Sequence, residues 1–189
     1  MNIKLFAALT IVATASMAAS AQGATAPLTL FGTHLQGATR TELRLALNKA
    51  GLSPIRVDGR YFCDSYAVHG QLAGASQLEV CYTLGNHFAL AQYTFPGSMD
   101  TALVKRVIDV VASKYGRPAS FSGDVNLGNV AALWNEPGGM RIVVARGWPD
   151  TTTFLGLEDP ATERRMKAQA ANAQHERRQE QARHDSKAF

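Results

Sequence analysis

The sequence lacks most of the features that mark an enzyme or a membrane protein. Its 189 residues contain no nucleophile-elbow, Walker, dinucleotide-binding glycine or zinc-protease motif. After the N-terminal leader, no apolar run reaches the roughly 20 residues that a spanning helix needs. The five histidines include no pair in the body at the usual spacing of metal ligands. We therefore expect a non-catalytic protein with no cofactor, no metal and no transmembrane segment.

An excess of charge is also missing from the central part of the chain. The formal net charge is +4, yet residues 22–159 hold eleven basic and eleven acidic residues. The surplus comes from Lys4 in the leader and from the tail that follows Pro160. Because the body is neutral, the basic pI does not indicate a nucleic-acid-binding core, and we expect no nucleic-acid partner.

The first 21 residues have the pattern of a secretory signal peptide. Lys4 supplies the positive start, residues 5–17 are apolar or small, and Ala19-Ser20-Ala21 is a small-x-small cleavage signal. The alternative, a membrane anchor, is disfavoured by the short apolar run. We expect cleavage after Ala21 and a periplasmic or secreted protein.

Cys63 and Cys81 are the only cysteines of the chain. In an oxidising compartment, an isolated pair of this kind is typical of a structural disulfide. A redox-active or metal-binding pair is the alternative, but the close C-x-x-C spacing that such sites use is absent. We therefore predict a Cys63–Cys81 bridge.

The first part of the body combines a short helix with strands. Thr39 and Glu42 form a capping box at the start of a helix over residues 40–50, and Gly51 is placed to end it. Short runs rich in β-branched and aromatic residues follow at 61–68, 77–83 and 88–95, and residues 84–87 read as a hairpin turn.

The second part repeats this order. A helix capped by Ser98 or Asp100 and ending at Gly116 precedes strands at 130–135, 140–146 and 151–157. The predicted fold class is α+β, with two helix-plus-antiparallel-meander units packed as one domain and a C-terminal helix behind them. We expect a flexible lead-in at residues 22–30, the domain at 31–159 and the tail at 160–189.

This order of elements resembles a group of small exported bacterial proteins that includes β-lactamase inhibitor proteins and the small lipoprotein of the outer-membrane assembly machinery. The resemblance rests on the capped helix at 39–51, and on Tyr115-Gly116-Arg117-Pro118, which closes the second helix ahead of strands that contain Trp134. It covers residues 31–158, departs from the group in lacking a lipobox cysteine, and implies binding or assembly rather than catalysis. It transfers no site residues.

The tail is rich in alanine, glutamine, glutamate and arginine. Asp159 and Pro160 can open a helix, and Glu163 with Lys167 makes a favourable pair four residues apart. Because no apolar stripe follows, we expect a protruding, solvated helix. The alternative is that this basic segment binds an anionic surface.

The candidate binding residues are exposed aromatics and tail arginines. We predict contact with a protein partner in the cell envelope through Tyr61, Trp148, Arg177 and Arg178, and we expect Trp134 to be buried. The alternative from another class is a small periplasmic hydrolase that uses His69 or His87 with Asp64.

Overall fold

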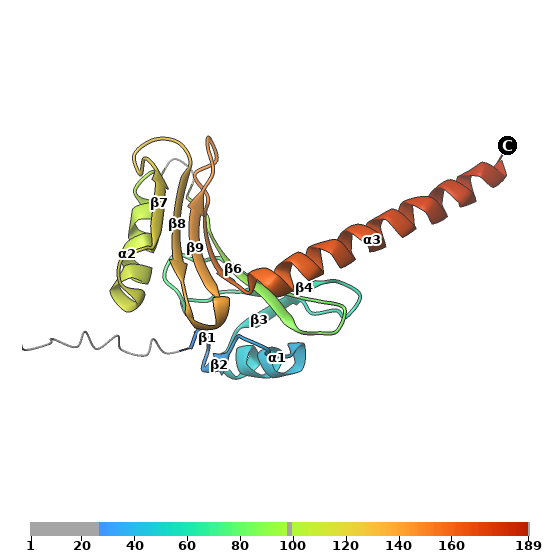
Figure 1. Ribbon diagram of the computed structural model, residues 1–189, viewed down its shortest axis with the longest axis horizontal. Coiled ribbons are helices and arrows are strands. Elements are labelled where there is room, and N and C mark those ends of the chain that lie inside the picture. The colour runs from blue at the N-terminus through green and yellow to red at the C-terminus, as the bar shows by residue number, and fades with distance from the viewer. Residues whose placement is uncertain (1–26, 98–99, 189) are drawn as a thin grey trace, which may run out of the picture.

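The computed structural model describes residues 27–97 and 100–188, and within them the chain runs as helix, four strands, helix, four strands, helix (Figure 1). A two-stranded hairpin of β1 (Thr29–Leu30) and β2 (Thr33–His34) precedes α1 (Arg40–Lys49). The first meander is β3 (Ser53–Arg56), β4 (Cys63–Ala67), β5 (Gln77–Tyr82) and β6 (Phe88–Phe95). The second unit is α2 (Leu103–Tyr115) with β7 (Ser120–Gly123), β8 (Val130–Asn135), β9 (Arg141–Arg146) and β10 (Thr153–Glu158). The C-terminal helix α3 spans Pro160–Asp185, and short 3₁₀ turns span Pro137–Gly139 and Ser186–Ala188.

The two meanders join into one antiparallel sheet of eight strands. Its order is β3-β4-β5-β6-β10-β9-β8-β7, so the units meet where the last strand of each, β6 and β10, lie side by side. The predicted α+β class and the two helix-plus-meander units are confirmed. Each meander has four strands rather than the three we predicted.

The two strands that the sequence did not reveal lie at the edges of the sheet. All four residues of β3 and all four of β7 are exposed, so neither has a buried side that would alternate with a polar one. β3 also contains Pro54, a residue that the interior of a sheet excludes. Without alternation, no period-2 signal exists to predict them.

The first helix begins as its capping box predicts. The Thr39 backbone N–H donates to the Glu42 carboxylate over 2.8 Å, and the Thr39 hydroxyl accepts from the Glu42 N–H over 3.3 Å. The second helix begins differently, because its N-cap is Ala102 and no side chain caps it. Asp100 instead accepts from the Ala102 N–H over 3.1 Å, and Ser98 lies outside the described residues.

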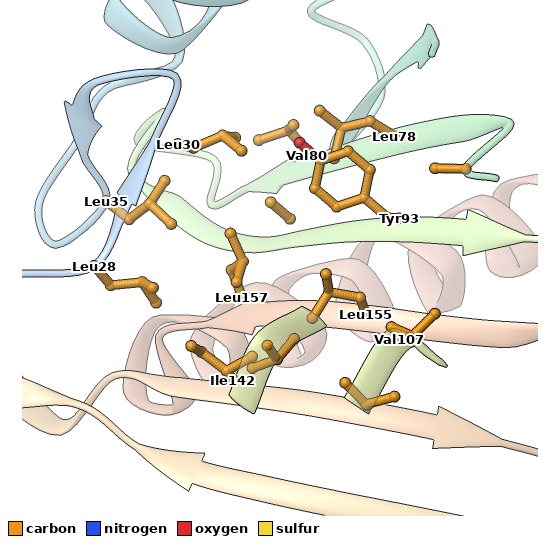
Figure 2. Packing of buried hydrophobic residues seen from close by; sticks show 14 of the residues in the cluster. Leu28, Leu30, Leu35, Leu78, Val80, Tyr93, Val107, Ile142, Leu155 and Leu157 are labelled. Carbon is orange, nitrogen blue, oxygen red and sulfur yellow. The ribbon is translucent and has the colours of Figure 1, made fainter. Parts of the chain in front are cut away.

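Both α1 and α2 pack on the same face of the sheet, which we call the inner face, and the main core lies beneath them. The core joins Leu43 and Leu47 of α1, Val104 and Val107 of α2, and the inward residues of six strands. Figure 2 shows Tyr93 and Leu155 on neighbouring strands, with Val107 of α2 beside Leu155. Trp134 is buried as expected, and its indole N–H donates to the Gly116 carbonyl over 2.8 Å, which ties β8 to the end of α2.

The segment before α1 belongs to the core rather than to a flexible lead-in. Leu28, Leu30 and Leu35 are 2%, 4% and 0% exposed, and the Leu35 N–H donates to the Leu28 carbonyl. Of the flexible lead-in that we expected over residues 22–30, residues 28–30 therefore belong to the folded body, and residues 22–26 lie outside the described residues. Isolated leucines in and around a hairpin of two-residue strands have no periodicity, so no local pattern predicts their burial.

Arg146 is a buried arginine that holds a loop in place. It is 1% exposed and donates five hydrogen bonds of 2.8–3.2 Å, all to backbone carbonyls. The acceptors are Thr101 ahead of α2 and Asp124, Val125 and Gly128 of the β7–β8 loop. One guanidinium thus fixes the entry of α2 against the second meander.

Cys63 and Cys81 form the predicted disulfide between directly opposed positions of β4 and β5. The bridge lies on the outer face of the sheet, opposite α1 and α2. There Met166 of α3 packs against Cys81 and Ala89, with Phe62 and Leu90 at the margin. The bridge is therefore covered by the start of the tail helix.

The tail helix is only in part the separate protrusion that we predicted. Asp159 caps it, Thr162 and Met166 are buried, and the Gln169 side chain accepts from the Leu84 N–H over 2.9 Å. Beyond this contact α3 extends away from the sheet, as Figure 1 shows. The folded body therefore includes the first turns of α3. Glu158 is the last residue of β10 and directly precedes the capping Asp159.

Candidate functional site

Two adjoining cavities lie between α2 and the first unit, on the inner face of the sheet. Their volumes are about 360 and 240 Å³, and they share Leu72, Val110 and Leu155 as lining residues. We call the pair the α2 cavity. The larger part is also lined by Ala73, Gly74, Phe95, Leu103, Arg106 and Val107. The smaller part adds Thr29, Leu30, Phe31, Gln71, Tyr93, Val111, Lys114, Tyr115, Ile142 and Leu157.

One face of α2 forms the long wall of this cavity. Leu103, Val107, Val110 and Lys114 recur at three- and four-residue spacing, so their side chains lie in a row along the helix. Val110 lies in the middle of that row and is 55% exposed. The other exposed residues near it on α2, Lys105, Arg106 and Asp109, are charged, so an exposed valine is unusual there. An apolar side chain that stays exposed here marks the rim of the cavity.

The opposite wall comes from the loop between β4 and β5. Gly74 has φ +82°, and a Cβ on it would lie 3.8 Å from the Phe95 ring. The left-handed backbone is strained for any side chain, so glycine is required to turn the loop there. This turn places Leu72 and Ala73 across from α2.

Tyr93 supplies a polar group in an otherwise apolar wall. It stands between Leu78 of β5 and Leu155 of β10 in the sheet register and is 6% exposed. Its hydroxyl makes no hydrogen bond with the described residues, and burial among apolar neighbours raises its pKa to about 12. The hydroxyl oxygen is not among the fully buried polar atoms that lack a partner, so it is accessible beside the cavity, where a ligand or solvent can pair with it.

A second polar cluster lies under α1. Asp64 of β4 is fully buried and accepts two hydrogen bonds from Arg40 (2.6 and 3.1 Å) and two from Arg44 (both 2.8 Å). Burial by itself would raise the pKa of Asp64, but the hydrogen bonds and charges of Arg44 and Arg40 lower it below its ordinary value. The Arg40 guanidinium also lies 4.9 Å from the centre of the Tyr82 ring.

This cluster does not form the acid–base pair of the hydrolase alternative. All four hydrogen bonds to Asp64 come from arginines, which leaves the carboxylate no role as the partner of a histidine. His69 is exposed in the loop after β4, and its backbone N–H donates to the Gln71 side chain. His87 is exposed and pairs by backbone with Thr39. Among the described residues, no hydrogen bond or ion pair joins Asp64 to either histidine.

The predicted partner-binding residues are exposed but do not form one surface. Tyr61 is 47% exposed and stacks with Arg56 at 4.8 Å, just before β4. Trp148 is 48% exposed in the β9–β10 turn. The sheet register places these two turns at opposite ends of the strands. Cys63, which follows Tyr61, is in register with Glu158 at the end of β10. Arg146, which precedes Trp148, pairs with Thr153 at the start of β10.

Arg177 and Arg178 lie on the exposed, projecting part of α3. Their role in binding stays a prediction, as do those of Tyr61 and Trp148.

Within residues 27–97 and 100–188, the structure holds no group of three or more His, Cys, Asp or Glu side chains suited to a metal ion. None of the helices in this part of the chain combines the length and the apolarity needed to cross a membrane.

Sequence reasoning missed the α2 cavity entirely. Tyr93 reads as an ordinary strand residue, and Leu72 lies in a loop without periodicity. The one usable signal was Val110, an apolar residue on the otherwise charged face of α2. The pairing of α2 with the loop at 69–75 depends on contacts between distant segments, which no local pattern encodes.

The fold defines the class of protein: an α+β protein with a single eight-stranded antiparallel sheet made of two helix-plus-meander units, and a C-terminal helix. No protein-family model and no curated protein matches the sequence. Among solved structures, the chain is similar to a DUF4309 family protein (YjgB) from Bacillus subtilis subsp. subtilis str. 168, at 15% identity and a TM-score of 0.43. The alignment covers 67% of this chain and 82% of that chain.

This likeness assigns neither a family nor a function. The resemblance to β-lactamase inhibitor proteins and to the assembly lipoprotein is not shown by these comparisons; what they support is the distant neighbour alone.

Proposed function

We propose that this protein is an exported, non-catalytic binding protein of the cell envelope that holds an apolar ligand in the α2 cavity. The observation that carries the proposal is the cavity itself, whose larger part is lined by apolar side chains apart from Arg106. Concave, largely apolar sites with few polar groups are typical of small-molecule binding. Arg106 is itself paired with Asp100.

Export is supported by the disulfide and by the leader. The Cys63–Cys81 bridge is internal and covered by Met166, as expected of a structural disulfide formed in an oxidising compartment. The signal peptide that we predict, with its cleavage site after Ala21, lies outside the described residues. Mass spectrometry of the protein from a periplasmic fraction should show a chain that starts at Gln22, with no free thiol. An uncleaved chain in the cytoplasm would overturn the export proposal.

Ligand binding can be tested with an apolar fluorescent dye such as N-phenyl-1-naphthylamine. The oxidised mature protein should bind the dye, and Val110→Trp should block the cavity because Val110 lines both of its parts. Ser113→Trp is the matched control, since Ser113 is exposed on the same helix and does not line the cavity. Equal dye binding by both variants, or none by the native protein, would contradict the proposal.

A protein partner is the second candidate function, favoured by the outer face of the second meander. Leu133 of β8 and Val143 of β9 are directly opposed, Phe154 of β10 lies diagonally from Val143, opposite Ala145, and all three apolar side chains are only half-buried. None of the described helices lies over this part of the sheet (Figure 1). Half-exposed apolar side chains that adjoin in this way are typical of interaction surfaces.

Pull-down from envelope extracts would test this second candidate. A partner that binds the native protein should be lost with Val143→Glu and retained with Val110→Glu, on the opposite face. A chain ending at Ala170 would show whether Arg177 and Arg178 contribute, either to a protein or to an anionic surface. Binding to an anionic surface through the tail should weaken steeply with salt. Retention of the partner by Val143→Glu would exclude the outer face.

A further inference from the structure

The two ends of the α2 cavity differ in polarity. Towards the start of α2, the lining is apolar except for Arg106, whose guanidinium is engaged by Asp100. Towards the end of α2, polar side chains gather: Thr29, Gln71, Tyr93 and Lys114. Between Leu103 and Lys114 the helix rises about 16 Å, so the cavity is elongated in the direction of this gradient.

Lys114 is the cation at the polar end. It is exposed, its ammonium lies 4.9 Å from the centre of the Tyr115 ring, and it has no ion-pair partner among residues 27–97 and 100–188. Its charge also acts on Glu136, the buried acid after β8, one of whose oxygens has no hydrogen-bond partner. Gln71 is already engaged, because it bonds to His69 and to the Gly51 carbonyl. The polar groups that remain for a ligand therefore include the Lys114 ammonium and the Tyr93 hydroxyl.

We propose that the ligand is a single-chain amphiphile with an anionic head group, of the fatty-acid type. Its alkyl chain lies against Leu72, Phe95 and Val107, and its head group meets Lys114 and the hydroxyl of Tyr93. This inference rests on the proposed function, since it names the chemistry of the ligand that the cavity takes. An apolar ligand without a charged end would leave the Tyr93 hydroxyl unpartnered and Lys114 unused.

The test is displacement of N-phenyl-1-naphthylamine from the oxidised mature protein, below the concentration at which each competitor forms micelles. The competitors are decanoate, dodecanoate, tetradecanoate and hexadecanoate, and the primary alcohol matched to each. Affinity should rise about fourfold with each methylene until the cavity is filled. Each acid should bind about threefold to fivefold more tightly than its alcohol.

Variants separate the head group from the chain. Lys114→Met should abolish the difference in affinity between each acid and its matched alcohol. Lys105→Met is the matched control, because Lys105 lies on the same helix, pairs with Asp109 and is outside the cavity lining. Tyr93→Phe should weaken both competitors, since both would hydrogen-bond to its hydroxyl.

The outcomes distinguish the two proposals. If acids and alcohols bind equally, and Lys114→Met changes neither, the anionic head group is wrong and the apolar-ligand function stands. If the dye binds and no amphiphile displaces it, the amphiphile is wrong and the function again stands. If the native protein binds neither dye nor amphiphile, both proposals fall.

Discussion

Arg40 of α1 and Asp64 of β4 form a buried ion pair, with Nη2 2.6 Å from Oδ1 and Nε 3.1 Å from Oδ2. The side chains are 6% and 0% exposed, and Arg44 shares the same carboxylate. This cluster joins the first helix to the first meander by directional bonds, in addition to the leucines beneath it.

We expect Asp64→Ala to be strongly destabilising. Removal of the carboxylate leaves the buried Arg40 charge uncompensated, which should cost about 3–5 kcal/mol in the free energy of unfolding. Asp58→Asn is the control: its salt bridge with Arg60 is exposed, so the loss of stability should be far smaller than that of Asp64→Ala. Urea denaturation of both variants measures the difference, and equal losses would show that the buried pair has no special weight.

Mild acid should raise stability before stronger acid lowers it. Burial raises the pKa of Glu136 and of Glu158, so in each case proton uptake favours the folded state as the pH falls through the raised value. The pKa of Asp64 is lowered instead, so its contribution is complete above the unfolded value, near pH 4, and is lost as the pH falls through the folded value. Urea unfolding followed from neutral pH to about pH 3 should show this maximum.

Two substitutions show which carboxyl groups cause the rise and the fall in the free energy of unfolding with pH. Glu158→Gln should flatten the rise in stability, and Asp64→Asn should remove much of the acid loss. A profile that falls steadily from neutral pH would contradict the shifts at Glu136 and Glu158.

Arg146→Met should unfold the β7–β8 loop or the whole second unit. Four backbone carbonyls lose the five hydrogen bonds that Arg146 donates, and leaving them buried without a partner should cost about 3 kcal/mol or more. Arg146→Lys should recover only part of this loss, because an ammonium has three donors and no planar fork. Arg141→Met, at an exposed position of the same strand, should change stability by less than about 0.5 kcal/mol. Thermal unfolding of the three variants provides the comparison.

The start of α3 should matter for stability and its remainder should not. Met166→Ala exposes Cys81 and Ala89 and should cost about 2 kcal/mol. A chain that ends at Ala170 keeps Met166 and the Gln169 contact with Leu84, so its melting temperature should equal that of the native protein. A large loss on that truncation would show that the projecting part of α3 also stabilises the fold.

Local patterns in the sequence determined a large part of this architecture. The Thr39 capping box, the glycines that end the first two helices, the alternation within β8–β10 and the pair of cysteines each act between near neighbours or in a single strand pair. Their physical effects, such as hydrogen bonds to free helix N–H groups, do not depend on contacts between distant segments, so they can be predicted from the local sequence. The α+β class and the disulfide followed from them.

Tertiary structure alone decided which distant segments meet. The pairing of β6 with β10 creates one sheet, and only then do α2 and the loop at 69–75 enclose a cavity beside Tyr93. In the same way, Asp64 reads as an exposed acid in a strand until α1 places two arginines on it, and Arg146 reads as an edge cation until a loop wraps around it. Burial and hydrogen bonding of these groups are set by residues up to 45 positions away, so their pKa values, their structural roles and the candidate site could not be predicted from sequence neighbours.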